Sequence, residues 1–224
     1  MRSGGIVNMA NRWLPQVLMS MLVTMASLPA SAQLVPGKDY QLIKPPQPTP
    51  AGKNVEVIDF FWYGCGGCNQ LQPSLYAWLK RKPADVTFRR QPAAFQDNWV
   101  QLARTYYTIE ALDMADKLHG EVFDAIHKTK ALNPVTLSKS PDALFDWVAT
   151  KGVNRQKFVD AYKSFGVANR SQRTIDVTSA YNISSTPTLV IDGQYLVTPS
   201  GGYDVFFRNV DQLIDIARKN RGGK

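Results

Sequence analysis

Cysteine and histidine are scarce in this chain, with two of each among 224 residues. Two cysteines cannot supply a multi-disulfide framework, an all-cysteine zinc site or a four-cysteine iron–sulfur cluster within one chain. The sequence also lacks internal repeats and low-complexity tracts. Its composition, 44% hydrophobic and 20% charged, is typical of a globular protein. Apolar packing must therefore stabilise the fold, and the two cysteines are a candidate reactive pair.

Acidic residues are outnumbered, 18 against 26 basic ones, which gives a net charge of +8. The surplus is spread along the chain, so it indicates a solvated surface and no nucleic-acid site. Residues 14–28 are mostly apolar, follow two arginines and precede the small residues 30–32. Polar residues and a proline interrupt this run, whereas a membrane span needs about 18 unbroken apolar residues. We therefore expect 1–32 to be a signal peptide, cleaved near Ala32, of an exported protein that does not span the membrane.

The mature chain begins with a proline-rich arm, 33–54, in which 40–44 is a candidate edge strand. A buried strand over 55–61, a helix over 66–82 and a strand over 86–90 follow. This β-α-β order implies a parallel strand pair with a right-handed crossover.

Helical patterns dominate from 98 to 181. Ser140 is expected to cap a helix with Pro141 as its first residue. Asn154 is expected to open a helix that ends at Gly166, and another is expected over 168–181. The remaining expected elements are helices over 99–112 and 115–128, strands over 188–191 and 195–197 around the turn Asp192-Gly193, and a helix over 203–219.

Both cysteines lie in Cys65-Gly66-Gly67-Cys68, directly after the buried strand and at the start of a helix. Free amide groups and the helix dipole stabilise an anion there, so the pKa of Cys65 should fall below about 8.5. Cys65 can then attack or be attacked, and Cys68 can resolve the mixed disulfide. An inert disulfide is the alternative, but a loop this short constrains little of the unfolded chain. A metal site would need two more ligands, which His119 and His127 could supply by count, but both stand far from the spacing of zinc fingers.

Asp59 interrupts the apolar strand six residues before Cys65. Burial would raise its pKa, and the carboxyl group could then exchange a proton with Cys68. The alternation of the strand also allows Asp59 to face solvent. Thr186-Pro187, just before a strand, is a place where either a cis or a trans peptide bond fits, and a cis bond would present the Thr186 backbone to an extended peptide.

Together, the strand–Cys-x-x-Cys–helix unit, the upstream acid, the helical stretch and the Thr-Pro before the hairpin resemble the DsbA-type thiol–disulfide oxidoreductases over about 37–219. The resemblance implies an α/β, thioredoxin-like fold with an inserted all-helical domain. We expect the thioredoxin-like domain to comprise 33–96 and 168–224, and the inserted helical domain to comprise 97–167.

The family resemblance implies a periplasmic enzyme without a cofactor that oxidises the thiols of reduced or unfolded exported polypeptides. It assigns catalysis to Cys65, Cys68 and Asp59. A quinone-linked membrane reoxidase of the DsbB type would restore the disulfide, and the enzyme is expected to be a monomer. Residues expected to bind the polypeptide are Trp62, Gly66, Gly67, Thr186 and Pro187.

One departure from the family is the pair Gly66-Gly67, where the best-known members carry Pro-His. Because that histidine is credited with stabilising the thiolate, we expect a milder oxidant. A reductase or isomerase of the same fold, kept reduced by a membrane partner, is the near alternative. The arm before Val55 is too short for the dimerisation domain that such isomerases usually carry. A copper chaperone that binds metal through both thiolates is the alternative of a different class.

Overall fold

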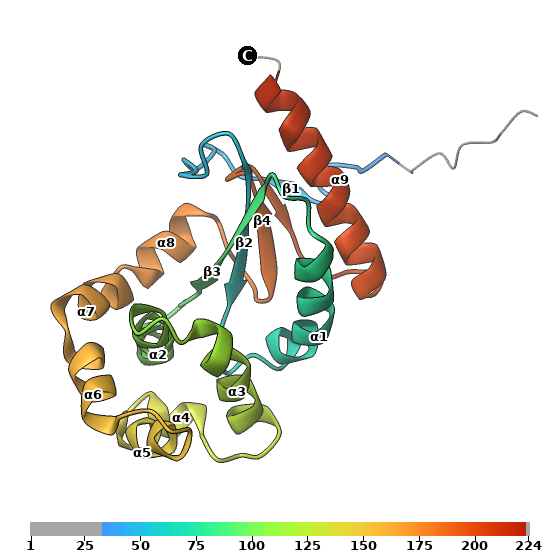
Figure 1. Cartoon of the computed structure of the whole chain (residues 1–224). Helices are drawn as coiled ribbons and strands as arrows, with labels where there is room; N and C mark the ends of the chain where they lie inside the picture. Colours follow the sequence, from blue (N-terminus) through green and yellow to red (C-terminus); the bar gives the residue numbers. More distant parts are fainter. Residues whose placement is uncertain (1–32, 223–224) are drawn as a thin grey trace, which may run out of the picture. The chain divides into compact units, whose positions relative to one another are not determined.

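A computed structural model describes residues 33–222 (Figure 1). The predicted signal peptide, 1–32, lies outside these residues. Within the described range no helix combines the length and apolar composition that a membrane span requires.

The sheet has five strands in the order β1-β5-β4-β2-β3. Strand β2 pairs in parallel with β3 and antiparallel with β4, while β5 pairs antiparallel with both β4 and β1. All seven residues of β2 are buried, as expected for a central strand covered on both faces. The strands are β1 (Gln41–Leu42), β2 (Val55–Phe61), β3 (Val86–Pro92), β4 (Thr188–Ile191) and β5 (Tyr195–Val197).

Helices α1 and α9 cover one face of the sheet, and the other helices lie between β3 and β4 in the chain (Figure 1). One hydrophobic cluster joins α1 and α9 to the sheet, and a second fills the helical part. The helices are α1 (Gly66–Arg81), α2 (Val100–Ala111), α3 (Ala115–His127), α4 (Pro134–Leu137), α5 (Asp142–Thr150), α6 (Arg155–Lys163), α7 (Phe165–Gln172), α8 (Thr174–Ala180) and α9 (Tyr203–Gly222), with a 3-10 turn, η1, at Asp97–Trp99.

The predicted edge strand, β-α-β unit and hairpin strands are confirmed, and so is the α/β class with helices inserted between strands. The hairpin turn has positive φ at both Asp192 and Gly193, and Gln194 is a third residue between the paired strands. The predicted division at 97 and 167 stays a prediction, because helices continue to Ala180.

Three helix boundaries predicted from the sequence are wrong. Pro141 precedes the first residue of α5, and the Ser140 hydroxyl accepts from the Asp142 amide at 3.3 Å. The helix from Asn154 ends at Lys163 because Ser164 is extended and its hydroxyl caps α7. The single helix expected over 168–181 is divided between α7 and α8. In the first two cases a serine hydroxyl accepts from a main-chain amide, which competes with helix continuation. The break between α7 and α8 falls at Arg173 and has no such side-chain cap.

Candidate active site

The cysteine pair lies at the junction of β2 and α1. Cys65 is the N-cap of α1 and is half-buried, whereas Cys68 is fully buried within its first turn. The Cys68 amide donates to Cys65 Sγ at 3.2 Å, and the Cys65 amide donates to the Trp62 carbonyl at 2.9 Å. The cap position thus directs unpaired helix amides at one sulfur only.

This placement separates the acidities of the two thiols. Hydrogen bonding from the Cys68 thiol, helped by the amides of Gly67 and Cys68 and opposed by partial burial, lowers the pKa of Cys65 to about 5. Burial raises the pKa of Cys68 far above its ordinary value, and the neighbouring Cys65 sulfur adds to the rise. At neutral pH the half-buried Cys65 is therefore a thiolate and the buried Cys68 a thiol.

The loop before β4 lies against this sulfur, although it is far away in the sequence. The Cys65 thiol, when protonated, donates to the Thr186 carbonyl oxygen at 3.3 Å. The Thr186-Pro187 peptide bond is cis. A Cβ on Gly67 would lie 3.2 Å from Pro187 Cδ and 3.8 Å from Cys65 Sγ, so a glycine permits the close approach. The structure thus brings together four of the residues that the sequence singled out, namely Cys65, Gly67, Thr186 and Pro187.

Asp59 lies in the middle of β2 and is buried, so the solvent-facing alternative is wrong. Neither carboxylate oxygen has a hydrogen-bond partner. Burial raises the pKa of Asp59 to about 7, with the charge of Cys65 adding to the rise and Arg90 opposing it. An acid whose pKa is near neutrality can both accept and return a proton under working conditions.

A polar contact between the cysteine turn and α3 was missed by the sequence analysis. His127 Nε2 donates to the Tyr63 carbonyl oxygen at 2.7 Å, and Tyr63 Oη lies 3.0 Å from His119 Nδ1. Burial keeps the pKa of His119 well below its ordinary value, so this ring is neutral. The signal available in the sequence was the spacing of His119, Phe123 and His127, which share one face of a helix.

Trp62 follows β2 directly, and its indole stacks on that of Trp99 with centroids 3.8 Å apart. The sequence singled out Trp62 but not its partner. Gly66 at the start of α1 is exposed, which leaves the approach to Cys65 open.

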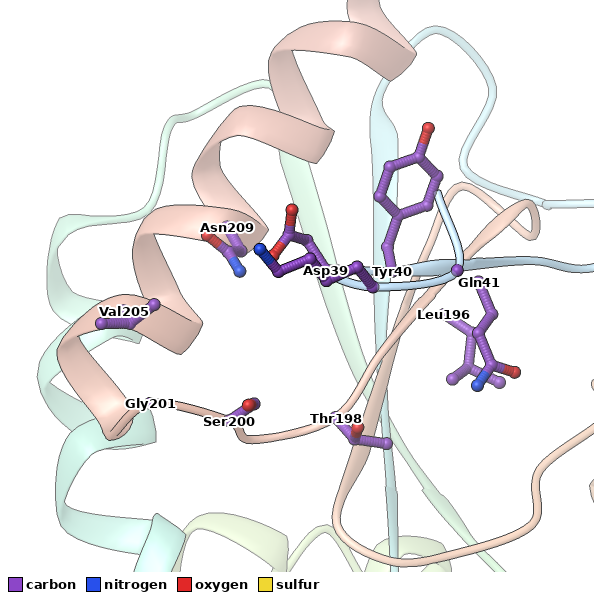
Figure 2. A pocket seen from close by; sticks show the side chains of 11 residues that line it. Asp39, Tyr40, Gln41, Leu196, Thr198, Ser200, Gly201, Val205 and Asn209 are labelled. Atoms are coloured by element: carbon purple, nitrogen blue, oxygen red, sulfur yellow. The ribbon is translucent and has the colours of Figure 1, made fainter. Parts of the chain in front are cut away.

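No group of three or more histidine, cysteine or acidic side chains that could hold a metal ion occurs within 33–222. A separate hollow of about 170 Å³ lies between the arm and the start of α9, and Figure 2 shows the side chains that line it. Its labelled polar side chains include Asp39, Thr198 and Asn209, and its lining contains neither cysteine nor histidine. The chemistry is therefore concentrated at the cysteine turn.

Comparison with known proteins agrees with this arrangement. A profile of the DSBA-like thioredoxin domain matches residues 69–210. The thiol:disulfide interchange protein DsbA of Burkholderia cepacia is 36% identical over 192 residues, which cover 83% of this chain and 88% of that protein. The protein of the same name from Pseudomonas aeruginosa is 31% identical over 209 residues, 90% of this chain and 96% of its own.

Solved structures lead to the same family. The crystal structure of P. aeruginosa DsbA superposes with a TM-score of 0.76 at 31% identity, covering 84% of this chain and 96% of that one. That of the oxidoreductase DsbA from Xylella fastidiosa gives a TM-score of 0.77 at 30% identity, covering 84% and 98%. The chain belongs to the DsbA-like family of thioredoxin-fold thiol:disulfide oxidoreductases.

Proposed function

We propose that this protein is a periplasmic dithiol oxidase that donates its Cys65–Cys68 disulfide to exported polypeptides. The observation that carries the direction is the low pKa of Cys65, about 5. A sulfur that is stable as a thiolate is a good leaving group, and stabilising the reduced form makes the disulfide a stronger oxidant. The names of the relatives, thiol:disulfide interchange proteins, support the reaction class.

The exchange takes two steps. A client thiolate attacks Cys65 Sγ of the disulfide, which forms a mixed disulfide and releases Cys68 as a thiolate that takes up a proton. A second client thiolate then attacks the client sulfur of the mixed disulfide and releases Cys65 as a thiolate. The client loses two electrons and gains a disulfide, and the enzyme gains both electrons as a dithiol.

Asp59 is proposed to supply the proton that Cys68 takes up. The support is electrostatic: burial and the charge of Asp59 raise the pKa of Cys68 far above that of Asp59, so the Cys68 thiolate is the stronger base and takes the proton from the Asp59 carboxyl group. The carboxyl group of Asp59 is buried and accepts no hydrogen bond that would hold it in the charged form. The same transfer runs in reverse when the disulfide is restored.

The client backbone is proposed to bind beside the Thr186-Pro187 loop, with Gly66, Gly67 and Trp62 completing the surface. Thr186 lies outside β4 and makes no main-chain hydrogen bond to another loop within 33–222. Its main chain can therefore receive an extended peptide as an added strand. We further propose that the enzyme acts as a monomer after removal of 1–32 and that a quinone-linked membrane protein of the DsbB type reoxidises it.

The reduction potential of the pair, measured against glutathione buffers, tests the direction. We expect a value between about −120 mV, that of DsbA, and about −270 mV, that of thioredoxin. With Gly67 in place of a histidine, the anion is favoured by Cys68, Thr186 and the helix amides, with no imidazole beside it, so the value should lie below about −120 mV. A potential near that of thioredoxin would reverse the direction and favour the reductase or isomerase. Metal bound at stoichiometric level by the purified reduced protein would favour the copper chaperone.

A further inference from the structure

Helix α3 holds the cysteine turn at two points, and no step of the exchange above uses either contact. Both contacts are made to Tyr63, a buried residue two positions before Cys65. Its hydroxyl lies 3.0 Å from His119 Nδ1, and its carbonyl oxygen accepts from His127 Nε2 at 2.7 Å. The side chain and the main chain of one residue are therefore both bonded to a helix that is distant in the sequence.

Phe123 fills the space between the two histidines. Residues 119, 123 and 127 are four apart, so they share one face of α3. The ring centroid of Phe123 lies 5.0 Å from that of Tyr63 and 5.2 Å from that of His119. Contacts from three successive turns of one helix fix the position of Tyr63 against α3.

The buried imidazole of His119 is costly to the fold. Burial keeps its pKa well below the ordinary value, so the ring is neutral, and Nε2 has no hydrogen-bond partner among residues 33–222. A leucine in this aromatic surrounding would leave no nitrogen unsatisfied, and a buried polar pair adds little stability over an apolar pair of the same shape. The bond to Tyr63 therefore contributes a defined position more than it contributes stability.

The link from Tyr63 to the reactive sulfur is short and closely packed. A Cβ on Gly64 would lie 2.3 Å from the ring of Trp62, so this position requires glycine. The Cys65 amide donates to the Trp62 carbonyl oxygen at 2.9 Å and closes the turn. Cys65 Sγ lies 3.2 Å from the Cys68 amide nitrogen and 3.3 Å from the Thr186 carbonyl oxygen. Because these contacts are long for hydrogen bonds to begin with, a small shift of the turn weakens them.

We propose that His119 and His127 are positioning residues for disulfide exchange. By bonding the hydroxyl and the carbonyl of Tyr63, they hold Cys65 Sγ where the helix amides reach it. This inference rests on the proposed function, because it concerns how the same sulfur is placed. A helix inserted between β3 and β4 then sets how readily Cys65 reacts, in addition to packing within its own hydrophobic cluster.

Paired substitutions separate positioning from packing. Tyr63→Phe and His119→Leu each leave one buried polar group without its partner, whereas the double variant replaces both by apolar groups. In urea unfolding of the reduced proteins, each single variant should have a lower midpoint, and the double variant should recover much of the loss. Exchange with a dithiol peptide should instead stay about fivefold slower than wild type in all three, because each lacks the bond.

The acidity of Cys65 gives a readout that packing alone would not move. The rate of alkylation by iodoacetamide, followed against pH, measures the pKa of this thiol. A sulfur that is displaced from the helix amides is less stable as an anion, so the pKa should rise by about half a unit in all three variants. His119→Gln, whose amide can bond to the Tyr63 hydroxyl, should recover part of the exchange rate and of the pKa shift.

Tyr107→Phe is the matched control. Tyr107 is also buried, and its hydroxyl accepts from Gln91 Nε2 at 2.7 Å in a bond that joins α2 to β3. This variant should lower the urea midpoint and leave both the exchange rate and the pKa of Cys65 unchanged.

Recovery of exchange together with stability in the Tyr63→Phe/His119→Leu double variant would overturn the proposal, because packing would then account for every effect. So would a wild-type pKa of Cys65 in all three variants. Failure of the proposed function looks different: the wild-type disulfide would then oxidise neither the peptide nor glutathione, while alkylation would still report on the placement of Cys65.

Discussion

Strand β2 carries two buried carboxylates, of which one is paired with an arginine and the other has no hydrogen-bond partner. Glu56 is 3% exposed and Asp59 1% exposed, and their spacing puts them on opposite faces. Glu56 Oε1 accepts from Arg89 Nε at 2.8 Å. Asp59 accepts no hydrogen bond, although Arg90 is its neighbour on β3.

The arginines explain the difference. The Arg90 guanidinium lies 5.2 Å from the ring centroid of Phe88 and 5.7 Å from that of Tyr76, so aromatic faces engage its charge. Glu56 is neutralised by an ion pair, whereas Asp59 is neutralised by a proton that it can give away. The first carboxylate belongs to the structure of the sheet, and the second is available for chemistry.

Removing the Cys65 sulfur has the largest expected effect on exchange. Cys65→Ser should reduce the rate of disulfide transfer to a dithiol peptide by about 10⁴-fold or more, since the variant cannot form the Cys65–Cys68 disulfide that the client thiolate attacks. Glu56→Gln, at the structural carboxylate, should retain the rate per folded molecule. Substantial transfer by the serine variant would remove Cys65 from the mechanism.

The two carboxylates should differ in the sign of their effect on stability. Arg89→Ala leaves Glu56 buried and unpaired and should cost about 3 kcal/mol of the free energy of unfolding, the low end for a buried pair because Arg89 is partly exposed. Asp59→Asn should instead stabilise the reduced protein by up to about 4 kcal/mol at pH 8. Urea unfolding of both reduced variants measures the two values.

The pH dependence gives the sign of the Asp59 effect. Its folded pKa, about 7, exceeds its unfolded value, so the folded state binds the extra proton and loses stability as pH rises from about 4 to 7. The advantage of Asp59→Asn should therefore appear over that range and vanish near pH 4. Cys65, whose pKa is lowered, works in the opposite sense, because it adds stability as pH rises from about 5 towards 9. A pH-independent gain would mean that Asp59 is charged in the folded state.

Asp59→Asn should also slow exchange, by roughly a hundredfold, the lower end of general acid–base catalysis. The wild-type rate should show an inflection near pH 7 that the asparagine variant lacks. Rapid mixing of oxidised protein with a dithiol peptide, across a range of pH, measures it. A slower rate with an unchanged inflection would reduce Asp59 to a packing role.

The features that could be predicted from the sequence are those formed by residues close together in the chain. Adjacent residues specify the buried strand, the helix start and the Cys65–Cys68 pair, so these were accessible from pattern alone. The facing direction of Asp59 was not, because both faces of β2 are buried and alternation loses its meaning there. The family resemblance, and no local pattern, grouped Thr186 with the residues around Cys65, and the contact between the two came only from the structure.

Contacts between distant segments could not be predicted in this way. The stacking of Trp62 on Trp99 depends on where η1 follows β3, and the pairing of Glu56 with Arg89 depends on strand register. The prediction of one helix running past Ser164 was wrong for another reason. Two helices joined by one extended residue preserve the apolar periodicity, so the capping hydroxyl was the only local signal.

The smallest expected effect concerns His127. Like Glu56, and unlike Asp59, its side chain has a hydrogen-bond partner, and that partner lies in the cysteine turn. His127→Ala removes the hydrogen bond to the Tyr63 carbonyl and should cost about 1 kcal/mol of stability. Because that carbonyl lies two residues before Cys65, the turn should also loosen, and peptide exchange should fall a few-fold. His127→Gln, whose amide can donate to the same oxygen, should recover most of both losses. Loss of stability without any change in exchange or in the pKa of Cys65 would show that α3 supports the fold and does not position the sulfur.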